Sequence, residues 1–125
     1  MRLLLVLLGG ALGSGARYGV ALWAASRFGT AFPLGSLTIN VSGSFLIGLL
    51  AALADQLGRI GPEWRVFLLA GVLGGFTTFS GFSLDTVRLM EQNEPARALA
   101  NILASVTLAI FATLLGVAAG FLLGR

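Results

Sequence analysis

The strongest constraint on this chain comes from four long apolar stretches separated by short polar connections. A membrane-spanning helix needs about 20 mostly apolar residues, and each stretch approaches or exceeds that length. The first stretch contains one charge, Arg17, and the second and fourth contain none. The third is uncharged to Leu84 and extends to about Met90 if Asp85 and Arg88 lie near its end. The stretches cover residues 3–25, 34–54, 66–84 and 98–123.

These stretches predict an all-α membrane protein with a single four-helix transmembrane domain over residues 1–125. All three prolines, Pro33, Pro62 and Pro95, fall in or beside the connections, where a missing N–H does little harm. The apolar start resembles a signal peptide, but it runs past a normal apolar core and three more spans follow. We therefore expect helices at about 3–27, 34–54, 66–90 and 97–123.

The composition excludes most soluble classes. Charged residues make up 10% of the chain, against about 25% in an ordinary soluble domain. The chain has no Cys and no His, which excludes disulfides, thiolate metal sites and a Ser-His-Asp triad. Its arginines are scattered singly, which argues against a nucleic-acid partner. We expect a multi-pass membrane protein that is not an enzyme.

The distribution of arginines predicts an unusual topology. Lys and Arg normally accumulate on the cytoplasmic side and set the orientation. With four spans, the two sides differ by a single arginine, so chains of both orientations would insert and pair as an antiparallel homodimer. The alternative is one orientation set by other topogenic features. One side carries Arg2, Arg59, Arg65 and Arg125, and the other carries Arg27, Arg88 and Arg97.

The third stretch contains a run that is poorly suited to a helix, GGFTTFSGFS at 74–83. Glycine carries a backbone entropy cost, and Ser and Thr side chains compete for backbone hydrogen bonds. The run predicts a break near the middle of the third helix. Irregular backbone at membrane depth must lie inside protein or beside a water-filled cavity, and freed carbonyls there can bind a small hard cation. The alternative is a continuous helix whose small residues only pack.

Asn40 is the most polar side chain of the second span. Polar groups inside a membrane tend to face an interior or a path. Its amide could donate to a desolvated anion, or it could make an ordinary interhelical hydrogen bond. Phe79 and Phe82 share a helix face and could present positive ring edges to an anion, or they could simply pack.

Three motifs together resemble the CrcB/Fluc fluoride channels. They are GGFTTFSGFS at 74–83, Gly35-x-Leu37-x-x-Asn40-x-x-Gly43, and Gly13-x-x-x-Arg17-Tyr18. The resemblance covers all four spans. It implies a passive, fluoride-selective channel in the cell inner membrane, surrounded by lipid, that lowers cytoplasmic fluoride. It also implies an antiparallel homodimer with a structural sodium ion (Na+) at its centre.

The resemblance assigns roles to particular positions. Phe79, Phe82 and Asn40 match the pore phenylalanines and asparagine, and Gly74 and Thr77 match the residues whose carbonyls bind sodium. Further polar pore positions match or adjoin Thr38, Thr78, Ser80 and Ser105.

Two positions depart from the family pattern: Asn101 stands where many members have Tyr, and Asp85 where many have Glu. Both departures bear on the shape of the pore. The competing interpretations are a small multidrug transporter and a purely structural membrane subunit. Proton-coupled drug export needs a membrane-embedded carboxylate. Spans one, two and four have none, and Asp85 lies near the end of the third.

The balance of arginines yields the first testable prediction. Reporters fused after Arg125 should appear on both sides of the membrane. Two lysines added beside Arg2 should bias insertion and lower activity, because oppositely oriented partners become scarce. A single orientation for every molecule would contradict dual topology.

Overall fold

The regular structure of the chain is entirely helical in a computed structural model that describes residues 1–125. Four helical stretches are long and apolar enough to cross a membrane, which confirms the predicted all-α, four-span class. The first is α1 (Arg2–Phe28), and the second is α2 (Leu34–Ala51) with a π-helical turn, η1 (Ala52–Gln56). The third joins α3 (Pro62–Arg65), the π-helical η2 (Val66–Leu73), α4 (Gly74–Phe76) and α5 (Phe79–Glu91), and the fourth is α6 (Pro95–Leu123).

Two of the helical stretches begin at a proline. Pro62 opens α3 and Pro95 opens α6, so the third span starts four residues before the expected 66 and the fourth two before the expected 97. Proline suits the first helical position because its fixed φ is already helical and the missing N–H would have had no partner there. The prolines thus mark where these spans begin.

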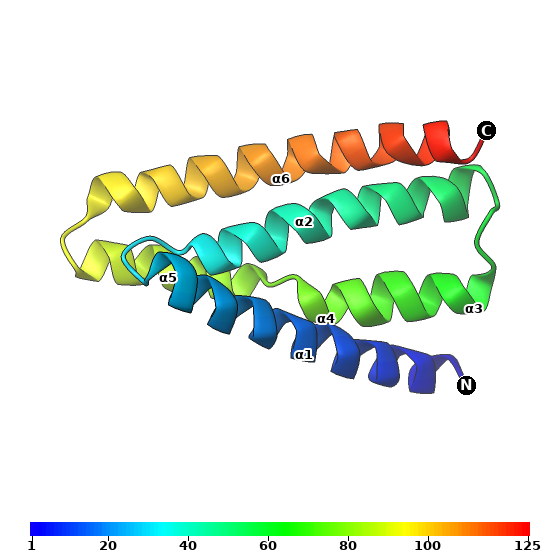
Figure 1. Cartoon of the computed structure of the whole chain (residues 1–125), viewed down its shortest axis with the longest axis horizontal. Helices are drawn as coiled ribbons and strands as arrows, with labels where there is room; N and C mark the ends of the chain where they lie inside the picture. The colour runs from blue at the N-terminus through cyan, green and yellow to red at the C-terminus, as the bar shows by residue number, and fades with distance from the viewer.

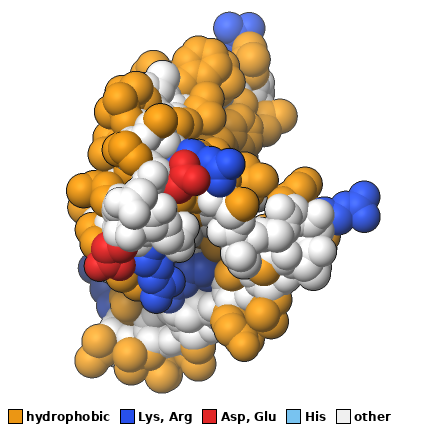
Figure 2. Space-filling model, turned by 90° about the vertical axis from the view of Figure 1, so that its left-hand side faces the viewer, with side chains coloured by type: hydrophobic (Ala, Val, Ile, Leu, Met, Phe, Trp, Pro, Cys, Tyr) orange, Lys and Arg blue, Asp and Glu red, His pale blue; other side chains and the backbone are white.

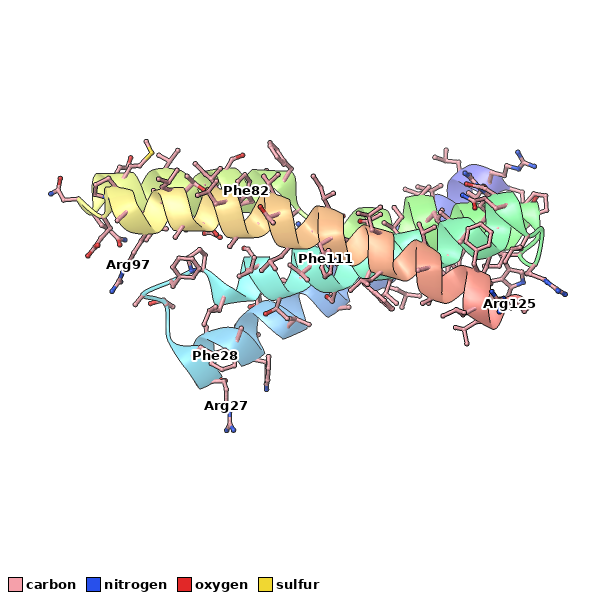
Figure 3. The ribbon with its side chains drawn as sticks, turned by 90° about the horizontal axis from the view of Figure 1, so that it is seen from above. Arg27, Phe28, Phe82, Arg97, Phe111 and Arg125 are labelled. Carbon is pink, nitrogen blue, oxygen red and sulfur yellow. The ribbon has the colours of Figure 1, made fainter.

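The four spans run side by side along the long axis of the molecule (Figure 1). Helix α6 lies along α2, and α1 lies along η2 and α4. The two termini and the η1–α3 connection lie at one end, and the α1–α2 and α5–α6 connections lie at the other. Figure 2 views this second end and shows acidic and basic side chains among apolar ones. Arg27 and Arg97 lie toward this second end and Arg125 lies at the other, as four spans require (Figure 3).

Close helix packing depends on glycine at several crossings. A Cβ on Gly9 would lie 2.6 Å from the Phe67 carbonyl oxygen, so α1 can approach η2 only with glycine there. Gly48 on α2 and Gly116 on α6 face the partner helix backbone in the same way. Lipid supplies no hydrophobic force between helices, so such close van der Waals contact takes its place. Only 18 of the 125 residues are buried, which leaves most apolar side chains on the outer surface, where lipid would solvate them.

Candidate functional site

Two extended residues, Thr77 and Thr78, separate α4 from α5 within the third span. Their backbone angles are φ −81°, ψ 154° and φ −148°, ψ 112°, far from helical values. Helix α5 restarts at Phe79, and the Thr78 hydroxyl caps it by accepting a hydrogen bond of 2.9 Å from the Gly81 N–H. The run of glycines and hydroxyl residues thus contains both the end of one helix and the start of the next.

Asn40 satisfies the backbone at this interruption. Its Nδ2 donates to the Thr78 carbonyl at 3.0 Å, and its Oδ1 accepts from the Thr78 N–H at 2.8 Å. The side chain of α2 thereby replaces the helical partners that Thr78 lacks. Asn40 was predicted either to donate to an anion or to make an interhelical hydrogen bond, and the structure shows interhelical hydrogen bonds. One amide hydrogen is left over, because an Asn side chain carries two.

A first cavity of about 410 Å³ lies beside the interruption, between α2, α5 and α6. Asn40, Thr78, Phe79, Phe82 and Ser105 all line it, and none of its lining residues carries a charge. The rings of Phe79 and Phe82 are tilted by 51° with their centroids 5.4 Å apart. Figure 3 shows Phe82 on α5. The structure therefore brings five of the predicted pore residues to one uncharged cavity.

A second cavity, of about 460 Å³, lies on the other side of Thr78. Arg17, from α1, lines it together with Ser80. The Thr78 and Ser80 hydroxyl oxygens are 3.3 Å apart, within hydrogen-bond distance. Thr78 therefore lines both cavities and places the interruption between a cavity with an arginine and one without charge.

A third cavity, of about 330 Å³, lies toward the end formed by the α1–α2 connection. Asp85 and Arg88 line it, and the Ser36 hydroxyl donates to Asp85 Oδ2 at 2.8 Å. Asp85, which stands where many family members have the longer Glu, is thus hydrogen-bonded to α2.

The structure separates Thr38 from the other predicted pore residues. Thr38 is exposed and lines none of these cavities, and its carbonyl accepts a hydrogen bond from Ser42. It lies two residues from Asn40, which is about 200° around a helix and therefore on the opposite face.

The carbonyls of Gly74 and Thr77 have lost their usual helical donors. In a continuous helix they would accept from the N–H groups four residues later. Instead, the Thr78 N–H donates to Asn40 and the Gly81 N–H donates to the Thr78 hydroxyl. The structure thus leaves these two oxygens without the donors that an unbroken helix provides.

Sequence reasoning missed Thr86. This residue is buried on α5, where it hydrogen-bonds Asn101 of α6 and the Phe82 carbonyl. Its position one helical turn after Phe82, on the same helix face, could have indicated it.

The chain matches the family described as CrcB-like protein, Camphor Resistance (CrcB), over residues 4–117. This chain belongs to the CrcB family. It is 53% identical to the fluoride-specific ion channel FluC of Rhizobium meliloti (strain 1021) over 116 residues, 93% of each chain. It is 51% identical over 115 residues to the FluC of Paracoccus denitrificans (strain Pd 1222), covering 92% of this chain and 90% of that one. The family match includes the interruption, Asn40 and both phenylalanines.

The pairing of Asn40 with Thr78 yields a prediction for this CrcB chain. Asn40→Ala should lower the free energy of unfolding by about 1–3 kcal/mol, because it leaves two backbone groups at membrane depth without partners. It should also speed hydrogen exchange at the Thr78 amide. Ser42→Ala is the matched control, since the Ser42 hydroxyl bonds only carbonyls of its own helix, those of Thr38 and Ile39. Thermal unfolding in detergent and amide exchange measure both effects, and equal behaviour of the two variants would contradict the prediction.

Proposed function

We propose that this CrcB-family protein is a fluoride channel that passively carries fluoride across the cell inner membrane and lowers its cytoplasmic concentration. A relative named fluoride-specific ion channel is 53% identical over 93% of this chain. The observation that carries the proposal is the uncharged cavity in which two phenyl rings, an amide and hydroxyls meet at a helix interruption.

The chemistry of this cavity suits a small, strongly hydrated anion. A selective pore must replace the water around the ion, yet bind weakly enough to release it. The remaining amide hydrogen of Asn40 offers a donor, and the edges of the two rings carry partial positive charge. The Ser105 hydroxyl donates to Asn101 over a long bond of 3.3 Å and offers a second donor when its single hydrogen turns from Asn101 to the ion. No full positive charge lines this cavity, so an ion held there can leave.

Arg17 has a different role in this proposal. It lines the neighbouring cavity with Ser80, on the other side of Thr78. A cation in a cleft raises the local concentration of anions. Arg17 therefore attracts fluoride to a vestibule, while Thr78 and Ser80 lie between the vestibule and the rings. We place Asn40, Thr78, Phe79, Ser80, Phe82 and Ser105 on the path, and Thr38 stays a prediction from the family resemblance alone.

The working unit is an antiparallel homodimer in this proposal. Phe79 is 78% exposed in the single chain, although it lines the same cavity as Asn40 and Thr78. Polar groups that faced lipid at this depth would be costly, so the cavity needs a protein cover. A second copy of the chain supplies that cover, and the near-even arginine distribution permits it to insert in the opposite orientation.

A structural sodium ion at the dimer centre is the second part of the proposal. Sodium prefers hard oxygen ligands, which the carbonyls of Gly74 and Thr77 are. Both oxygens lack their usual helical donors, because the N–H groups of Thr78 and Gly81 bond elsewhere. Two such carbonyls from each copy would hold the ion, which would fix the two interruptions relative to each other.

Replacing the rings tests the channel. Phe79→Ile and Phe82→Ile keep an apolar side chain but remove the ring edges. If the rings only pack, each swap should cost less than about 1.5 kcal/mol of stability and leave flux intact. We expect fluoride efflux from proteoliposomes to collapse while size-exclusion chromatography still gives a monodisperse dimer.

Phe111→Ile is the matched control. Phe111 lies on α6, is exposed, and does not line the cavity (Figure 3). Asn40→Asp adds a test of charge, since a carboxylate offers no amide donor and repels an anion. Normal flux through all three cavity variants would mean that the path lies elsewhere, and absence of flux in the unmodified protein would overturn the channel itself.

Exchange of the solution cation tests the sodium site. After prolonged equilibration in choline chloride, the purified dimer should unfold at a lower temperature than in sodium chloride, because a ligand bound only to the folded state stabilises it. Thr77→Ser should keep this difference, because the backbone and not the side chain binds the ion. Equal unfolding temperatures in the two salts would contradict the sodium site.

A further inference from the structure

Three buried polar residues form a line of hydrogen bonds that begins at Ser105, in the wall of the first cavity. Thr86, Asn101 and Ser105 are 7%, 2% and 8% exposed. The Ser105 hydroxyl donates to Asn101 Oδ1 at 3.3 Å, Asn101 Nδ2 donates to Thr86 Oγ1 at 2.9 Å, and Thr86 Oγ1 donates to the Phe82 carbonyl at 2.8 Å. The line therefore runs from α6 to α5 without a break.

The direction of each hydrogen bond follows from its neighbour. Thr86 donates its single hydroxyl hydrogen to the Phe82 carbonyl, so toward Asn101 it can act only as a hydrogen-bond acceptor. This requires the amide nitrogen of Asn101 to face Thr86, which turns the amide oxygen toward Ser105. The orientation of Asn101 is thus set by Thr86.

The two ends of the line are cavity walls, but its middle is not. Phe82 and Ser105 line the cavity with Asn40, whereas Thr86 and Asn101 do not. Phe82 belongs to α5 and Ser105 to α6, so the hidden pair joins a wall on one helix to a wall on the next. Without the pair, nothing else polar links these two walls directly.

We propose that Thr86 and Asn101 are positioning residues of the anion path, which set the spacing between the Phe82 ring and the Ser105 hydroxyl. This inference rests on the proposed channel function. An ion that sheds its water needs donors at defined distances, because the pore must replace the hydration shell and still release the ion. An interhelical hydrogen bond in a membrane adds little net stability while both partners are present, although removal of one partner leaves the other unsatisfied.

Thr86→Val tests the proposal because it removes the hydroxyl and keeps the branched shape. We expect the initial rate of fluoride efflux from proteoliposomes to fall by about tenfold or more. Thr86→Ser keeps the hydroxyl and should restore most of the rate. Ser42→Ala is the control: the Ser42 hydroxyl bonds only carbonyls of its own helix, those of Thr38 and Ile39, and none of these three residues lines the cavity.

A double variant separates positioning from stability. Thr86→Val alone leaves the Asn101 amide without its acceptor and could disturb folding. Replacing both partners of a buried hydrogen bond by apolar groups can be nearly neutral for stability. Asn101→Leu also removes the side-chain acceptor of the Ser105 hydroxyl, which can donate instead to the backbone carbonyl four residues earlier. Thr86→Val with Asn101→Leu should therefore elute as a folded dimer and still conduct slowly.

The possible outcomes distinguish this inference from the channel proposal. Slow efflux in the folded double variant, with rescue in Thr86→Ser and a normal rate in Ser42→Ala, supports positioning. A normal rate in the double variant, or equal loss in Thr86→Ser and Thr86→Val, overturns it while the unmodified protein still conducts. No efflux from the unmodified protein overturns the channel proposal and this inference together.

Discussion

The reciprocal hydrogen bonds between the Asn40 side chain and the Thr78 backbone make an interrupted helix tolerable in this protein. A membrane offers no water to satisfy a free N–H or C=O, so backbone that leaves the helix must find its partners in protein. The amide of Asn carries both a donor and an acceptor and can serve the two groups of one residue at once. The extended residues can therefore lie beside a cavity without unpaired polar groups at Thr78.

The interruption places different chemistry on its two sides. Thr78 lies between a cavity that contains Arg17 and one that contains only neutral side chains. An arginine attracts an anion over several ångströms, whereas amides, hydroxyls and ring edges bind it weakly at contact distance. A channel needs both properties in sequence, because strong attraction throughout would trap the ion. In the proposed channel, the two cavities that share Thr78 would supply these two properties within a short chain.

The size of the chain shapes how this site is enclosed. Few residues are buried, and the cavity beside Phe79 remains partly open in the single chain. Four helices of this length have little interior. Glycine contacts such as those of Gly48 and Gly116 bring the helix backbones close together, and the polar face remains at the surface. In the proposed antiparallel dimer, a second copy would cover that face and would bring two freed carbonyls from each chain toward a common centre.

The amino-acid sequence by itself determined the class and the place of the irregularity. Four apolar stretches have one stable solution in lipid, and the glycines and hydroxyl residues at 74–83 weaken a helix wherever it packs. These are properties of local composition, which do not depend on neighbours. The predicted starts of the third and fourth spans lay four and two residues too late. Proline at the first helical position extends each helix into residues that the sequence pattern assigned to a connection.

Only the tertiary structure decided which polar groups meet. The pairing of Asn40 with Thr78, the exposure of Thr38 on the opposite face, and the line from Ser105 to Phe82 through Thr86 all depend on how each helix is rotated about its axis. Hydropathy does not set that rotation in a membrane, because both faces of a span are apolar and lipid solvates either one. It is set by close contacts between glycines and backbone and by the pairing of buried polar groups, which exist only once the helices have come together.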